Sequence, residues 1–111
     1  MTTFEKIITA IQPFGYPYAQ DVYVGESDHW FTYNYVSDYG DLYSDNEPSE
    51  IVVSVQVHLY LPLQEEFIEL KNRVRRAIYA QGFTLPQITF QMTEDKVYRH
   101  MIFTCNIEEE E

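Results

Sequence analysis

Histidines, a cysteine and clustered carboxylates are the side chains of this 111-residue chain that could take part in catalysis or bind a metal. The only thiol, Cys105, falls on the apolar side of an alternating pattern, so we expect a buried hydrophobic residue rather than a nucleophile. His58 and His100 occupy the semi-polar sides of two such patterns and could be neighbours in one sheet. Two histidines without a nearby carboxylate or thiolate make a weak metal site. We therefore expect no enzyme, no metal site and no cofactor.

The most concentrated group of carboxylates falls in the turn-rich stretch 37–50. Its acids do not follow the ligand spacing of a calcium-binding loop, and a solvated loop is the simplest interpretation. Such a length is also typical of a protruding, functional loop, and apolar side chains among the acids could anchor a protein partner. The interface candidates in this stretch are Tyr39, Leu42, Tyr43, Asp45 and Glu47.

The formal charge of −11 limits the partners that this chain could bind. It disfavours stable binding to nucleic acid or to an anionic membrane, because both require a basic surface. No apolar run approaches the roughly 20 residues needed to cross a bilayer. The charge is uneven, since residues 1–50 carry nine acids and one base, whereas residues 51–111 carry nine acids and six bases.

Four of those bases cluster on one predicted helix, and they complete the interface candidates: Lys71, Arg73, Arg75 and Arg76. One interpretation is a solvated helix face with intrahelical ion pairs such as Glu69–Arg73. The other is a basic surface that contacts the acidic loop of a second copy. Such a contact between unlike surfaces is heterologous, and it generates a ring if its rotation closes.

The hydrophobic pattern predicts two helices and four strands that would position these residues in one domain, 1–111. Thr2 and Glu5 have the spacing of a capping box for a short first helix, and a second helix is predicted over Gln64–Gln81. An acidic, flexible tail is expected at 108–111. The predicted strands are 30–36, 51–61, 87–93 and 97–107, with a possible short strand at 21–25. We expect an α+β domain of order α-β-β-α-β-β, whose four-stranded, mainly antiparallel sheet carries both helices on one face.

Several short segments, taken in this order, have the layout of a known family. The most specific are Leu42–Glu47 (LYSDNE) and a helix ending in Gln81–Phe83 (QGF), followed by a hairpin that contains Tyr98–His100 (YRH). With these segments, the chain resembles the small tail-completion proteins of long-tailed phages and prophages, the tail-terminator or head–tail joining group. The likeness extends from about Thr3 to Ile107, and none of the shared segments is a catalytic signature.

The resemblance implies a structural protein that works without catalysis or a cofactor. Proteins of this group form a ring, typically a hexamer, that caps the tail tube and joins it to the head connector. The implied partners are other copies of the chain, the tail tube protein and the connector or neck protein. The implied location is the tail–head junction of the virion, after assembly in the cytoplasm of the bacterial host. The resemblance transfers no site residues.

Two other functions stay open at this point. The net charge also fits an acidic DNA mimic that inhibits a host nuclease or DNA-binding protein. A DNA mimic needs carboxylates spread over one face at phosphate-like intervals, whereas these acids fall mainly in predicted loops and in the tail. A general protein-binding module is the third possibility.

Overall fold

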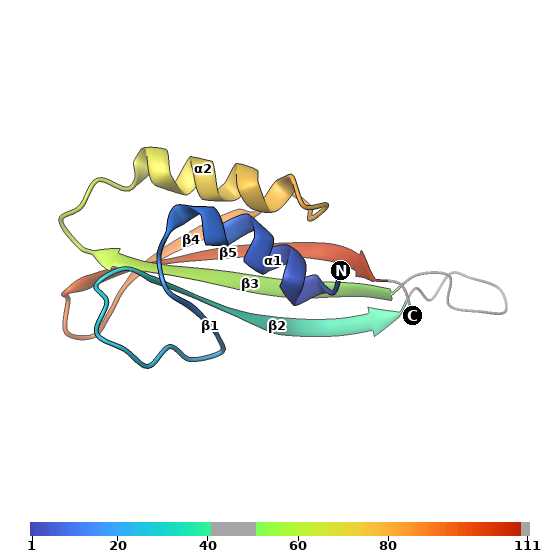
Figure 1. Cartoon of the computed structure of the whole chain (residues 1–111), viewed down its shortest axis with the longest axis horizontal. Helices are drawn as coiled ribbons and strands as arrows, with labels where there is room; N and C mark the ends of the chain where they lie inside the picture. The colour runs from blue at the N-terminus through green and yellow to red at the C-terminus, as the bar shows by residue number, and fades with distance from the viewer. Residues whose placement is uncertain (41–50, 110–111) are drawn as a thin grey trace, which may run out of the picture.

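The computed structural model describes residues 1–40 and 51–109, which form a sheet with two helices on one of its faces (Figure 1). The elements are, in chain order, α1 (Thr3–Ile11), the 3-10 turn η1 (Gln12–Phe14), β1 (Tyr18–Gln20), β2 (Trp30–Gly40), β3 (Ile51–Pro62), α2 (Ile68–Tyr79), β4 (Gln87–Met92) and β5 (Tyr98–Glu109). Among these residues, no helix is long and apolar enough to span a bilayer.

The sheet has five strands in the order β1-β2-β3-β5-β4, so the predicted four-stranded sheet and its α-β-β-α-β-β order are wrong. β1 pairs in parallel with β2, and the other three pairings are antiparallel, which makes the sheet mixed. β1 has only three residues, and its pairing with β2 defines it as a strand. Just before β1, Phe31 N of β2 donates a hydrogen bond to Pro17 O (2.8 Å). The possible strand at 21–25 is also wrong, because Asp21 has a positive φ of 65° and turns the chain away from β2.

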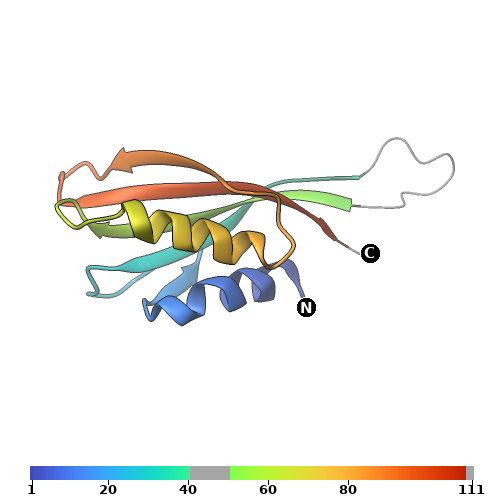
Figure 2. The ribbon, with the colours of Figure 1, turned by 90° about the horizontal axis from the view of Figure 1, so that it is seen from above.

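Figure 2 shows α1 and α2 side by side over one face of the sheet, and the buried side chains of the core lie between that face and the helices. Alternate residues of β3 and β5 are buried there, as the period-2 pattern predicted. The central members of this core are Val53, Val55, Val57, Leu59, Leu61, Met101, Phe103, Cys105 and Ile107. Burial raises the pKa of the Cys105 thiol to about 12, so the side chain packs as a small hydrophobic residue.

The helix termini follow local signals in the sequence. The predicted capping box at α1 is confirmed, because Thr2 Oγ1 accepts from Glu5 N and the Glu5 side chain accepts from Thr2 N. The helix predicted over Gln64–Gln81 is shorter at both ends, since Glu65 N donates to Pro62 O in a turn and α2 begins at Ile68. Beyond Tyr79, Gly82 has a φ of 100° and reverses the chain.

Two strands continue further than their hydrophobic patterns indicated. β2 extends to Gly40, so the first four residues of the predicted loop 37–50 belong to a strand that pairs with the start of β3. β5 extends to Glu109, which pairs with Ile51. The strand therefore includes the first two residues of the tail predicted at 108–111. The rest of that loop and the end of the tail lie outside the described residues.

Candidate functional site

The four predicted basic residues lie together on α2, and two of them have local partners. Lys71 Nζ donates to Asn72 Oδ1 at 3.1 Å, and the Arg73 guanidinium lies 5.3 Å from the centre of the Phe14 ring. Within residues 1–40 and 51–109, no ion pair links any of the four to a carboxylate, and the predicted Glu69–Arg73 pair is absent there. Among the described residues, α2 therefore presents a cationic surface that is uncompensated by carboxylate partners, on a chain of net charge −11.

Arg75 and Arg76 line a shallow groove between α2 and the segment that leads into β4. The groove has a volume of about 450 Å³ and is lined by Asn72, Arg75, Arg76, Tyr79 and Leu85. The Arg75 Nε atom is buried and has no hydrogen-bond partner among the described residues. Neither Arg75 nor Arg76 has a carboxylate partner among the described residues, so this groove is suited to a ligand that carries a carboxylate. The position of Leu85 beside the basic residues was not predicted from the sequence.

The predicted candidates of the acidic stretch are placed only in part. Tyr39 belongs to β2 and pairs with Val52 of β3. Leu42, Tyr43, Asp45 and Glu47 lie outside the described residues. Of these candidates, only Tyr39 has a described position, which is in β2.

The face of the sheet opposite the helices carries a row of aromatic rings that sequence reasoning missed. Trp30 stacks on Tyr60 with ring centres 4.7 Å apart, and Tyr60 stacks on His100 at 4.2 Å. Tyr23 stacks on the other side of Trp30 at 5.6 Å. Aromatic rings of this kind can stack on nucleic-acid bases, but such binding also needs positively charged side chains along the nucleic-acid backbone. The only Lys or Arg in β2, β3, β4 and β5 is Arg99, which lies 4.1 Å from the Phe67 ring centre.

His58 and His100 are neighbours, as predicted from their places in the strands. Asn34 Nδ2 donates to Tyr35 O, so Asn34 Oδ1 is left to accept from His58 Nε2 at 2.8 Å. His58 Nδ1 must then accept from His100 Nε2, at 2.7 Å. This arrangement needs a neutral His58 ring, because a protonated His58 would turn an N–H toward the His100 donor. Burial, with the nearby His100, lowers the pKa of His58 to about 4, and burial also lowers the pKa of His100.

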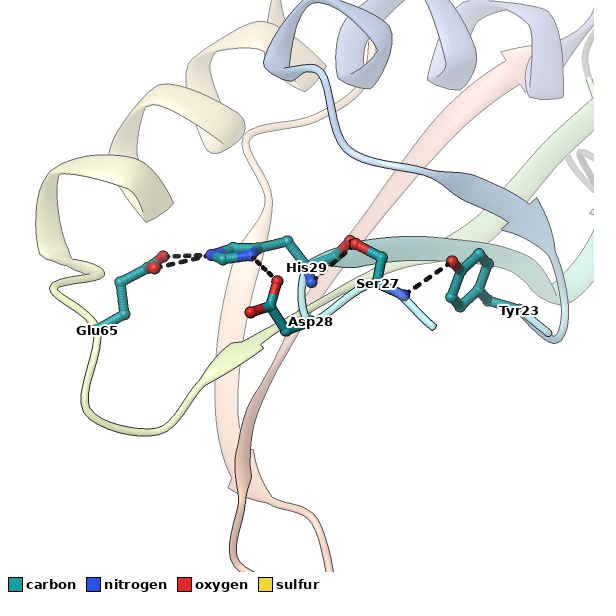
Figure 3. Close-up of polar contacts among 5 residues, drawn as sticks. All are labelled: Tyr23, Ser27, Asp28, His29 and Glu65. Atoms are coloured by element: carbon teal, nitrogen blue, oxygen red, sulfur yellow. Dashed lines mark hydrogen bonds and ion pairs between the residues drawn. The ribbon is translucent and has the colours of Figure 1, made fainter. Parts of the chain in front are cut away.

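The third histidine links the β1–β2 connection to the segment before α2 (Figure 3). His29 Nε2 lies 2.7 Å from Glu65 Oε2, and His29 Nδ1 lies 2.9 Å from Asp28 Oδ1. Burial alone would lower the pKa of His29, but the hydrogen bonds to the two carboxylates outweigh it and the pKa is raised. Ser27 Oγ donates to the His29 backbone carbonyl rather than contacting the ring, so these residues do not form a nucleophile–base pair.

Replacing His29 with glutamine should remove a pH-dependent link between these two segments. His29 carries its charge in the folded state up to its raised pKa, so its contribution to stability is full below about pH 6.5 and is lost as the pH rises through that pKa. We expect His29→Gln to lower the free energy of unfolding by about 0.5–1 kcal/mol at about pH 6 and by less at about pH 9. Urea unfolding at both pH values measures this, and an equal loss at both would contradict the charged link.

No arrangement in residues 1–40 and 51–109 brings three His, Cys, Asp or Glu side chains together in a way that could hold a metal ion. The features that these residues do offer are a cationic groove on α2, an aromatic row on the open face and exposed loops at the sheet ends. These features are suited to recognition of another macromolecule. No protein-family model matches the chain, and no curated protein matches it significantly.

Proposed function

We propose that this chain is a structural tail-completion protein of long-tailed phages, which assembles into a ring that caps the tail tube and joins it to the head connector. The observation that carries the proposal is the uncompensated cationic surface of α2 on an otherwise strongly acidic chain. In this account the protein needs no catalysis and no cofactor. It is assembled in the cytoplasm of the bacterial host and stays at the tail–head junction of the virion.

The charge distribution favours self-association between unlike surfaces. A basic patch on an acidic chain attracts the acidic surface of another copy, and this attraction steers the two copies into one orientation. Because the two contacting surfaces differ, each copy keeps a free surface of either kind and can bind another copy at both ends. Such a contact leads to a closed ring or to a filament. A ring of about six copies is the form that the resemblance implies.

The acidic DNA mimic is less well supported. Acids among the described residues sit at separate places, including Asp21, Glu26 and Asp28 in the β1–β2 connection and Glu94 and Asp95 in the β4–β5 turn. The central part of the open sheet face carries aromatic, histidine and uncharged polar side chains, whereas a mimic needs carboxylates there. The partners that we propose are therefore other copies of the chain, the tail tube and the connector.

Native mass spectrometry, with the chain alone and after mixing with purified tail tubes, tests this function. We expect a complex of about six copies, formed either in solution or only on the tubes. A monomer that ignores tail tubes and binds a DNA-processing protein in competition with DNA would contradict the proposal and would support the DNA mimic.

A further inference from the structure

We propose that the groove on α2 receives the β1–β2 connection of a second copy of this chain, and this inference rests on the proposed ring function. The acceptor groove is the surface lined by Asn72, Arg75, Arg76, Tyr79 and Leu85. The donor loop is the segment 21–28, between β1 and β2. Both lie within the described residues, and together they define one head-to-tail contact.

The acceptor groove combines unpaired positive charge with exposed apolar surface. Neither Arg75 nor Arg76 has a carboxylate partner among the described residues. Tyr79 and Leu85 beside them are 56% and 60% exposed. A segment that carries both a carboxylate and an apolar side chain would satisfy the guanidinium and cover the exposed apolar surface.

The strand next to the groove leaves room for a second copy. β4 is an edge strand of the described sheet and pairs only with β5. Its sequence, Gln87–Met92, contains none of the lysine or proline residues that commonly protect a sheet edge, and its Phe90 and Met92 side chains are exposed. An approaching chain would therefore find an open edge beside the cationic groove.

The donor loop has the complementary composition. Its carboxylates Asp21 and Glu26 are exposed, and its apolar side chains Val22 and Val24 are 69% and 92% exposed. Two exposed valines within a few residues of exposed carboxylates match a groove that offers arginine, tyrosine and leucine.

The donor loop is also held in place within its own chain, so binding does not have to order it. Asp21 N donates to Tyr33 O at 2.9 Å, and Ser27 N donates to the Tyr23 hydroxyl at 3.3 Å (Figure 3). The Tyr23 ring stacks on Trp30 of β2. A loop fixed in this way loses little conformational entropy when it binds.

The two surfaces lie at opposite edges of the sheet, because β1 and β4 are its two edge strands (Figure 1). One copy can therefore use its donor loop and its acceptor groove at the same time. This is the requirement for a ring built from a single repeated contact.

Charge reversal on each side of the contact provides the test. Arg75→Glu and Glu26→Arg should each weaken self-association by roughly tenfold or more, measured by sedimentation in solution or by binding to tail tubes. The double variant Arg75→Glu, Glu26→Arg should recover assembly. An equimolar mixture of the two single variants should also recover assembly with alternating copies, because the native contact forms at one junction and the charge-swapped contact forms at the next.

Matched controls keep the test specific. Lys96→Glu makes the same charge change in the β4–β5 turn, away from α2, and Glu94→Arg makes the opposite change in the same turn, so both should assemble like the unmodified chain. Circular dichroism confirms that each variant is folded. Ring formation that Arg75→Glu leaves intact, or that Lys96→Glu weakens equally, overturns the groove contact but not the ring function. Failure of the unmodified chain to assemble even on tail tubes overturns both.

Discussion

Replacing Phe103 with alanine should lower the free energy of unfolding by about 3–5 kcal/mol. The side chain is completely buried at the centre of the sheet, where Phe103 pairs with Val57 on one side and Ile88 on the other. Removing the ring loses the free energy gained by burying its apolar surface, and it leaves a cavity between the sheet and the helices. Because a domain of this length has a total stability of roughly 5–15 kcal/mol, the variant should unfold at a much lower urea concentration.

The neighbouring position on the same strand provides the control. Ile102 lies on the opposite, partly exposed face of β5, so Ile102→Ala should cost only about 1 kcal/mol. A loss at Ile102 as large as that at Phe103 would contradict this arrangement, in which the helices bury the face of β5 that carries Phe103 and leave the face that carries Ile102 partly exposed.

Acidification should destabilise the folded chain through His58. Its pKa is about 4 in the folded state against an ordinary value of 6.5, because burial and the adjacent His100 disfavour the charged ring. The unfolded chain therefore binds more protons than the folded chain between these pH values, and stability falls as the pH drops from about 6.5 to about 4. The shift corresponds to at most about 3 kcal/mol, and partial exposure of the ring reduces the expected loss to roughly 1–2 kcal/mol.

His58→Gln isolates this effect from the titration of the carboxylates. Glutamine cannot be protonated in this range, so the difference in unfolding free energy between the two proteins should shrink as the pH falls from about 6.5 to about 4. Urea unfolding at several pH values measures the difference. His29→Gln serves as a comparison because the His29 pKa is shifted in the other direction. A His58→Gln difference that is constant with pH would contradict the buried neutral pair.

The sequence patterns predicted the elements that depend on local signals. The alternation in β3, the capping box at Thr2 and the hairpin of β4 and β5 are all confirmed. β1 was missed because three residues are too short for a periodic pattern and its pairing with β2 depends on contacts across a loop. The ends of β2 and β5 were missed because polar residues such as Asp38 and Glu108 can lie in a strand when they are exposed.

The candidate site was predictable only where one helix carries it. The basic residues of α2 follow from the sequence, but the groove requires Leu85, which reaches the helix after the chain turns at Gly82. The contact between His29 and Glu65 joins positions 36 residues apart, and no periodicity encodes it. The aromatic row did leave a signal, because Trp30, Tyr60 and His100 all occupy the semi-polar sides of their strands.

Electron microscopy of purified tail tubes mixed with this chain tests the central claim most directly. A tag on the chain, detected with gold particles, shows where the protein binds. We expect one ring at a single end of each tube and none along its length. Tubes that stay bare, or that are decorated along their sides, would contradict a protein that completes the tail.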